Sequence, residues 1–204
     1  TQYFPTAELI DASSALKAAD DIEKMLYPFV TDDPVFGYMA PLSMKDFFDH
    51  ADIISTQNKI ESVENKTVIV YGIGASLIAN KADILVYADM PRWEIQLRYR
   101  SNSISNLGAE NKDAEFSYQY KRSFFVDWRV CDRHKKTLMH TWNFVLDTTV
   151  PQQPKMITAK TLADALEYTV HKPFRVVPFF DPGPWGGQWL KEICDLDHSQ
   201  QNFA

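Results

Sequence analysis

The sequence predicts an α/β protein in which a mostly parallel sheet is flanked by helices. Segments with strand character alternate with segments of helical periodicity, which is typical of parallel strands joined by crossover helices. The clearest strand, residues 67–71, is β-branched and apolar on both faces, as expected for a central parallel strand. The chain has 204 residues, 45% of them hydrophobic, and can therefore bury a substantial core.

Local signals in the amino-terminal part predict elements ahead of that strand. Residues 8–11 form a short apolar run that ends a strand, and a helix is expected over about 18–26. Residues 32–34, Asp-Asp-Pro, predict a turn, because aspartate side chains accept hydrogen bonds from nearby backbone and proline fixes φ. Ser43 is a helix-capping residue with an aspartate three positions later, so another helix is expected to start at 43–48.

The middle of the chain predicts a strand and two helices. The strand covers residues 84–88, and a helix over 92–100 begins directly after Pro91, where the first turn tolerates proline. Residues 102–111 form a polar loop, and a long helix is expected over about 114–140. Apolar residues of this helix recur near one stripe at three- and four-residue steps: Phe116, Tyr120, Phe124, Trp128, Cys131 and Leu138.

The remaining elements are shorter. Residues 142–146 are expected to form a strand, after which two prolines break the chain. A helix opens at a variant of the capping box and covers 161–171, and an apolar strand is expected at 174–180. The apolar residues expected to point inward from this helix are Leu162, Leu166 and Val170.

The composition changes abruptly at residues 181–187, which are rich in glycine and proline. We therefore predict two domains, an α/β domain over 1–172 and a connecting strand with the incomplete start of a second domain over 173–204. The sequence does not begin with methionine, so we expect it to be part of a longer polypeptide.

Composition argues against several classes of protein. The net charge of −6 disfavours a general nucleic-acid binder, which is usually basic. Cys131 and Cys194 are far apart and in no metal-binding spacing, so we expect free thiols in a reducing compartment. No apolar run approaches the roughly 18 residues of a membrane helix, and residues 1–5 do not begin a secretory signal. We expect a cytoplasmic protein with neither nucleic acid nor membrane as a partner.

Two glycines follow the strand at 67–71. Gly72 and Gly74 invite a dinucleotide-binding interpretation, but the third glycine of that motif would fall at Leu77. The next strand also begins too soon for a normal crossover helix, so a tight turn is the favoured interpretation. The chain contains no Walker A motif and so cannot form a P-loop phosphate cradle from its own residues.

Residues 92–136 form a locally basic segment with a balance of +4, whereas the rest of the chain has −10. This asymmetry indicates a candidate phosphate or anion site. Arg92, Gln96 and Arg100 share one helix face through their spacing. The alternative is a solvated helix face with local ion pairs, such as Asp132 with Lys136.

No metal site is visible in the sequence. The five histidines have no ligand spacing, and a catalytic zinc site usually needs three protein ligands. The pairs Asp20-Asp21 and Asp32-Asp33 favour helix-surface and turn roles over metal binding or acid–base chemistry. Trp185, Gly186 and Gly187 would suit a wall facing a sugar, the tight start of a domain, or a packing corner.

Three stretches resemble a known family. Residues 87–98 and 120–130, together with 173–191, are similar to a group of bacterial class I mannose-6-phosphate isomerases with a long amino-terminal extension. The resemblance covers essentially the whole chain. It implies that 173–204 opens a cupin domain, whose zinc would be bound by Gln, His and Glu residues further downstream. It therefore implies no cofactor and no catalytic residue in this segment.

The same resemblance implies a degraded kinase of the uridine-kinase type over residues 8–150, which is a P-loop-kinase-like fold without a Walker A motif. Asp33 then falls in the acidic segment that precedes a helix in such kinases and is a candidate for the substrate wall, with Trp185, Gly186 and Gly187. The candidate phosphate-binding residues, three of them placed as lid arginines would be, are Arg92, Arg98, Arg100, Lys121 and Arg122.

Three functions remain open at this point. The leading hypothesis is a non-catalytic domain that binds a phosphorylated sugar or nucleotide, or that regulates its own downstream cupin domain. The enzyme alternative is a nucleoside or sugar kinase whose P-loop lies upstream of Thr1. The third is a structural interaction domain with a large apolar partner surface.

Overall fold

The computed structural model describes residues 6–172 and Asp195. The chain divides into two compact units, Thr1–Ala159 and Lys160–Ala204. The first contains all the strands among the described residues and every side chain discussed below as a site. The predicted domain boundary at 172/173 lies 13 residues after this division, at the limit of the described part.

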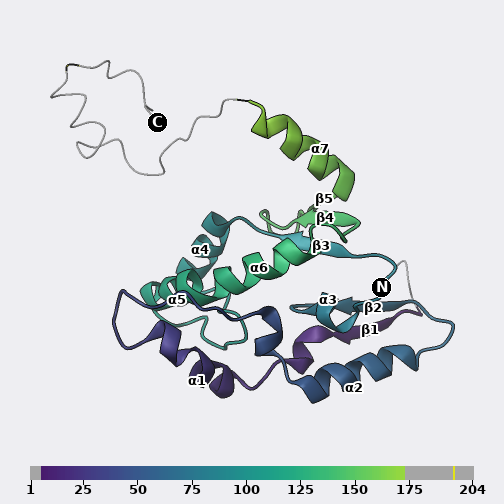
Figure 1. Cartoon of the computed structure of the whole chain (residues 1–204), viewed down its shortest axis with the longest axis horizontal. Helices are drawn as coiled ribbons and strands as arrows, with labels where there is room; N and C mark the ends of the chain where they lie inside the picture. The colour runs from purple at the N-terminus through teal and green to yellow at the C-terminus, as the bar shows by residue number, and fades with distance from the viewer. Residues whose placement is uncertain (1–5, 173–194, 196–204) are drawn as a thin grey trace. The chain divides into compact units, whose positions relative to one another are not determined.

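Five short strands form two sheets in the first unit (Figure 1). The first sheet pairs two strands in parallel, and the second combines a parallel pair with an antiparallel edge strand. The fold is therefore α/β with parallel pairing, but in two small sheets. The first sheet contains β1 (Glu8–Asp11) and β2 (Val68–Tyr71), and the second contains β3 (Val86–Asp89), β4 (Phe144–Asp147) and β5 (Lys155–Thr158).

The expectation that residues 67–71 form a central strand is wrong. Within the described residues, β2 pairs with β1 alone and is half-buried, because no third strand extends this sheet. Its β-branched sequence fits a strand that packs on one face only, so the pattern identified the strand but not its place in the sheet. The antiparallel strand β5 differs from the expectation, which places only a break of the chain at the prolines before it.

The main core lies beside the first sheet. Helix α1 (Ala19–Val30) turns Ile22, Leu26 and Val30 inward at four-residue steps, and they pack in one cluster with Phe47, Ile78 and Val126. The short 3-10 turns η1 (Ala12–Ala15) and η2 (Met44–Phe47) and helix α3 (Ala75–Ile78) border the same cluster. Helix α1 extends beyond the predicted end at residue 26 because Pro28 is accommodated inside it.

The predicted helix start at 43–48 is a single 3-10 turn, although Ser43 and Asp46 form the expected capping box. The longer helix follows at α2 (His50–Glu61), where the Asp49 carboxylate caps the first turn by accepting from the Ala51 and Asp52 amides at 2.8 and 3.2 Å. None of its side chains is buried, so it carries little of the periodicity from which helices are predicted.

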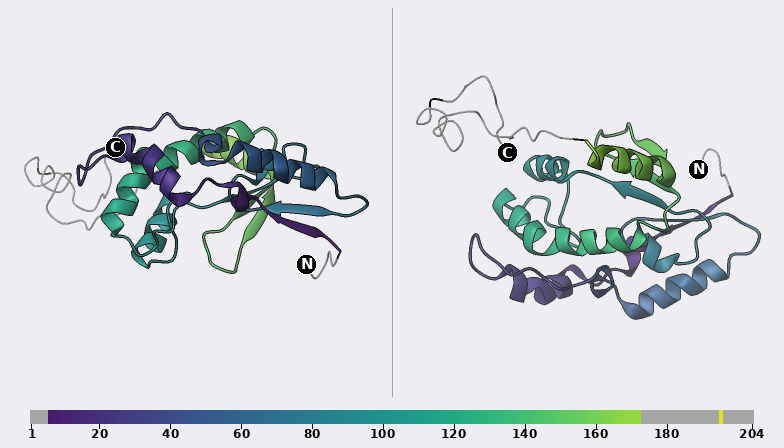
Figure 2. Two further views of the ribbon diagram at one scale, coloured as in Figure 1. Left: turned by 90° about the horizontal axis from the view of Figure 1, so that it is seen from below. Right: turned by 45° about the horizontal axis from the view of Figure 1, so that its top comes forward.

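The long helix is present as one continuous segment (Figure 2), and its winding changes along its length. It consists of α5 (Phe116–Arg122), the π-helical turn η3 (Ser123–Asp127) and α6 (Trp128–Leu138). Helix α4 has the predicted bounds, Arg92–Arg100, and a polar loop follows it as expected. The predicted apolar stripe does not form the buried face, since Tyr120 is exposed and only Trp128 of its six residues is buried.

The second unit contributes one described helix, α7 (Ala159–Val170), close to the predicted bounds of 161–171. Leu166 and Val170 are exposed, which differs from the inward orientation expected of them. The predicted strand at 174–180 lies outside the described residues. Across residues 6–172, no helix combines the length and apolarity needed to cross a lipid bilayer.

Candidate binding cavity

An open cavity of about 520 Å³ lies between the loop after α1 and the continuous helix α5–η3–α6. Its walls are almost entirely apolar, with Ser117, Lys121 and the hydroxyl of Tyr120 as the polar side-chain groups. Its volume is typical of small-molecule sites. The lining residues are Pro34, Val35 and Phe36 from the loop, and Phe116, Ser117, Tyr120, Lys121, Phe124 and Phe125 from the helix.

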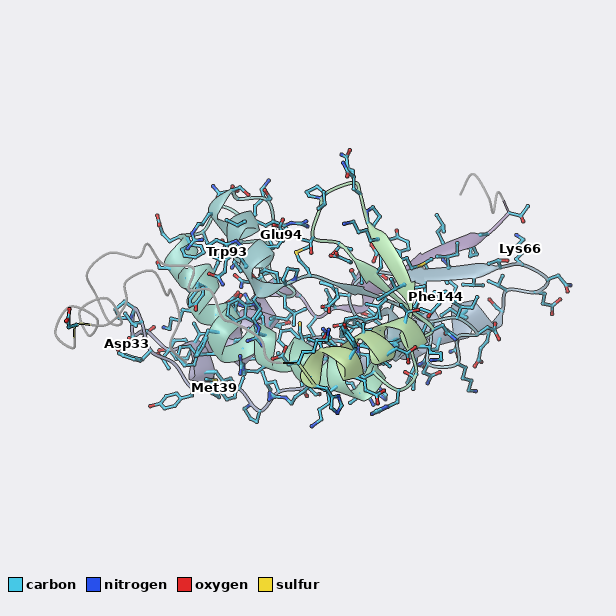
Figure 3. All side chains as sticks on the ribbon, turned by 90° about the horizontal axis from the view of Figure 1, so that it is seen from above. Asp33, Met39, Lys66, Trp93, Glu94 and Phe144 are labelled. Atoms are coloured by element: carbon cyan, nitrogen blue, oxygen red, sulfur yellow. The ribbon has the colours of Figure 1, made fainter. Side chains whose placement is uncertain are left out.

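The loop wall begins at Thr31, the residue directly after α1, which has a φ of 58°. The Asp33 carboxylate then accepts from the Val35 and Phe36 amides at 2.7 and 2.6 Å, as the Asp-Asp-Pro sequence predicted for a turn. These amides, Phe36 first, lower the pKa of Asp33, with a smaller contribution from the charge of Lys121. Asp33 and Met39, labelled in Figure 3, lie on this loop. Asp33 thus shapes the wall through its backbone contacts.

The carboxy-terminal end of the loop wall, at Gly37 and Ala40, also makes close backbone contacts. The Ala40 amide donates to the Phe125 carbonyl of the π-helical turn at 2.9 Å. Gly37 packs so tightly that a Cβ atom there would overlap the Phe29 carbonyl oxygen and meet the Phe125 ring at 3.0 Å. Because hydrogen bonds hold both ends of the loop, we expect the cavity to be preformed.

The helix wall is a row of aromatic rings. The centroids of Phe116 and Tyr120 lie 5.9 Å apart, and those of Tyr120 and Phe124 lie 6.4 Å apart with the ring planes only 17° from parallel. Phe124 and Phe125 lie in the π-helical turn, and both line the cavity. A hydrogen bond from the Trp128 amide to the Ser123 carbonyl closes this turn. π-Helical turns are rare and recur at functional sites, so this position favours a binding role.

Among the residues that the structure describes, Lys121 is the one charged residue that lines the cavity. It is 6% exposed, and its ammonium group donates to the carbonyl oxygens of Thr31, at 3.2 Å, and Asp33. Within residues 6–172 no carboxylate lies within ion-pair distance of it. An ammonium has three N–H donors, so one remains beyond these two contacts. A buried cation whose hydrogen-bond partners are neutral carbonyl groups attracts an anion.

Two arginines make cation–π contacts with aromatic rings that line the cavity. The Arg100 guanidinium lies 4.3 Å from the Phe116 centroid and 5.6 Å from that of Trp93, and the Arg129 guanidinium lies 5.6 Å from the Phe124 centroid. Neither has a carboxylate within ion-pair distance in the described part of the chain. Such cation–π contacts keep positive charge next to the cavity.

The other predicted phosphate-binding residues are engaged elsewhere. Arg92 forms an ion pair with Asp132, and its guanidinium lies 5.2 Å from the Trp128 ring centroid. Arg98 donates to Glu94 at 2.8 Å and to the Thr148 carbonyl at 3.0 Å. The five predicted residues therefore do not converge on one point. Only Lys121 lines the cavity, and Arg100 contacts one of its lining rings.

Arg122 is fully buried on the opposite side of the same helix. It donates to Glu23 and to the Leu107 carbonyl, and its Nε lies 3.5 Å from Oδ1 of Asp127. The other carboxylate oxygen of Asp127 accepts from the side-chain amide of Asn106 at 2.7 Å. Burial raises the pKa of Asp127, and the Arg122 charge opposes that rise. Sequence reasoning missed this network because it assumed an apolar core face.

A separate hydroxyl–imidazole contact joins α3 to α6. Ser76 Oγ lies 2.9 Å from His134 Nε2, both residues are half-buried, and burial lowers the pKa of His134. Ser76 follows the turn at Gly72 and Gly74, whose φ angles of 97° and 76° confirm the tight turn expected there. This contact joins two residues that lie 58 positions apart in the sequence.

Some predicted features cannot be placed. The substrate-wall candidates Trp185, Gly186 and Gly187 lie outside the described residues. In residues 6–172 no three His, Cys, Asp or Glu side chains gather as a metal-binding group. Cys131 has a free thiol whose pKa burial raises to about 12, which makes it a packing residue.

Comparison with known proteins identifies a family. No curated protein matches the sequence. One family model, described as Domain of unknown function (DUF8485), matches residues 1–171. This match covers most of the chain and includes all the residues described above that build the cavity and the buried network. The chain therefore belongs to the DUF8485 family.

Proposed function

We propose that the unit Thr1–Ala159 is a binding module for a small anionic ligand, with a phosphate group as the expected anion. The observation that carries this proposal is Lys121, a nearly buried ammonium group in the wall of an apolar cavity with neutral carbonyl partners. An anion that accepts from its remaining donor would form a charge-assisted hydrogen bond, typically about 1.5–3 kcal/mol. The low polarity of the walls would strengthen this interaction.

The wider context of this module is a proposal from sequence resemblance. We propose that it is the non-catalytic amino-terminal part of a mannose-6-phosphate isomerase-type protein, with a degenerate P-loop-kinase-like fold and a zinc-dependent cupin domain downstream. In that arrangement, ligand binding at the cavity would regulate or scaffold the cupin, and the polypeptide would act in the cytoplasm. The kinase alternative needs a P-loop upstream of Thr1, and a longer polypeptide that consumes ATP would support it.

One observation favours the structural alternative. Val35, Phe36, Tyr38 and Met39 are each more than half exposed, and this is an apolar surface of the kind that protein partners cover. This alternative predicts that no small molecule stabilises the protein. The experiment below therefore separates it from the binding module.

The test is thermal unfolding of the 204-residue chain with inorganic phosphate, sugar phosphates, nucleotides and sulfate at matched ionic strength. A ligand at about 100 times its dissociation constant adds about 2.7 kcal/mol to the free energy of unfolding, which is easily seen as a shift in Tm. The proposal expects a selective shift by at least one phosphorylated compound. No shift with any anion would contradict it and favour the structural alternative.

The variant Lys121→Met removes the charge while keeping an unbranched side chain, and should abolish the shift. Lys17→Met is the matched control, because the Lys17 ammonium also donates to a backbone carbonyl, that of Asp46 at 2.7 Å, but does not line the cavity. Lys121→Arg keeps the charge and should retain part of the binding. If Lys121→Met and Lys17→Met bind equally well, Lys121 is not the anion site.

A further inference from the structure

The phosphate-binding proposal leaves open whether the rest of the ligand is a sugar or a nucleoside. We infer that the ligand carries a flat heteroaromatic ring, so that the cavity takes a nucleoside monophosphate in preference to a sugar phosphate. This inference rests on the proposed function, because it assumes an anionic group at Lys121. Three observations on the cavity carry it: its shortage of polar groups, its aromatic wall and its exposed phenylalanine.

The polar inventory of the cavity does not suit a sugar. A hexose phosphate has several hydroxyl groups, and each needs a hydrogen-bond partner when it leaves water. The lining offers the hydroxyls of Ser117 and Tyr120, besides the ammonium of Lys121 that would hold the phosphate. The other lining side chains, all from Pro, Val and Phe residues, can neither donate nor accept. In this open cavity the hydroxyls of a sugar would stay partly in water and gain few hydrogen bonds from the walls, so the walls would add little affinity for it.

The aromatic wall suits a nucleobase. Bases stack on aromatic side chains irrespective of their identity, since every base presents a flat π face. Tyr120 and Phe124 lie nearly parallel along the helix, at 17°, and Phe116 continues the row. Lys121 follows Tyr120 directly in the chain, so the stacking surface and the cation are carried by one turn of one helix.

Phe36 provides a stacking surface from the loop. Its side chain is 70% exposed although it lines the cavity, so its apolar area is not consumed by packing. The hydrogen bond from the Phe36 amide to the Asp33 carboxylate, at 2.6 Å, fixes the backbone at this residue. A phenylalanine on a fixed backbone can contact a ligand without ordering a loop first, and such preorganisation favours affinity.

The decisive measurement compares the dissociation constants of adenosine 5′-monophosphate, uridine 5′-monophosphate, adenosine and mannose 6-phosphate for the full 204-residue chain, by calorimetry. The inference expects both nucleotides to bind at least about tenfold more tightly than mannose 6-phosphate, in line with the contribution of one stacked base. If mannose 6-phosphate binds as tightly as the nucleotides, the inference is overturned while the anion site stands.

The remaining outcomes separate this inference from the proposed function. If adenosine binds as tightly as its monophosphate, the ring is supported and the anion site at Lys121 is contradicted. If none of the four compounds binds, both proposals fail together.

The matched variants are Phe36→Ala and Tyr38→Ala. Both remove an exposed ring from the same loop, but Tyr38 does not line the cavity. Phe36→Ala should weaken nucleotide binding about fivefold or more and leave Tm unchanged, because its ring is not packed. Tyr38→Ala should change neither quantity. Equal nucleotide affinity in the two variants would overturn the part of the inference that assigns stacking to Phe36.

Discussion

The two faces of the helix α5–η3–α6 differ in which side chains they bury, and the polarity of the residues alone does not explain the difference. The face toward the core buries Gln119, Arg122 and Asp127, all polar or charged. The face toward the cavity leaves the aromatic rings of Phe116 and Tyr120 partly in solvent. Part of the aromatic surface of this helix thus faces solvent, although Val126 and Val130 of the same helix are buried.

The difference shows that partners, rather than residue polarity, decide burial in this helix. Arg122 can be buried because Glu23, Asp127 and the Leu107 carbonyl surround its guanidinium. The exposed rings of Phe116 and Tyr120 gain no comparable stabilisation from contact with water. Exposed apolar surface around a cavity is a sign of ligand or partner binding. The buried face serves stability and the open face is available for recognition.

The largest expected effect comes from breaking the buried face. Arg122→Ala should lower the free energy of unfolding by about 3–5 kcal/mol, because it leaves the Asp127 carboxylate buried without its cation. Chemical denaturation measures this change directly. Arg92→Ala is the control, since its ion pair with Asp132 is about half exposed on both sides and should contribute less than about 1 kcal/mol. Equal losses in the two variants would show that the buried network does not stabilise the fold.

Elements with a strong local signal were predictable from the sequence. Helix α4 has the predicted bounds because Pro91 fixes where it starts, and the loop at Asp33 forms through the side-chain contacts that its sequence favours. The turn at Gly72 and Gly74 is likewise local. These features depend on residues within a few positions of one another, which is the range that sequence patterns report.

The site was only partly predictable, because it depends on long-range contacts. The basic segment includes Lys121, which lines the cavity, but spacing could not show that Arg122 turns toward Glu23, 99 positions earlier in the chain. The spacing predicts an aromatic stripe, but not that a loop some 80 positions earlier in the chain lies across part of it. The cavity joins residues about 80–90 positions apart, and no local pattern links them.

A second prediction concerns the loop wall of the open face. Gly37→Ala places a methyl group against the Phe29 carbonyl and the Phe125 ring, so the loop must move. We expect a loss of about 1–3 kcal/mol in the free energy of unfolding, as for other overpacked sites. We also expect weaker ligand binding, because the same loop carries Phe36.

Val35→Ala provides the comparison for Gly37→Ala. The Val35 side chain is 62% exposed on the same loop, so its truncation should leave the free energy of unfolding nearly unchanged. If Gly37→Ala were as stable as Val35→Ala and bound ligand normally, the loop would adapt freely. The cavity would then not be preformed.

The smallest expected effect lies further along the same helix, at His134, which is half-buried beside Ser76. Burial lowers its pKa below the ordinary value of 6.5, so the unfolded chain binds a proton more readily than the folded one. This contribution to stability is complete above about pH 6.5 and is lost as the pH falls from there through the lower folded-state pKa. Titration of the His134 ring by NMR, with denaturation between pH 7.5 and 5 for wild type and His134→Gln, measures both quantities. Ser76→Ala should leave the pKa below 6.5, because burial is its cause, whereas a value at or above 6.5 would mean that this side of the helix is as open to water as the aromatic face.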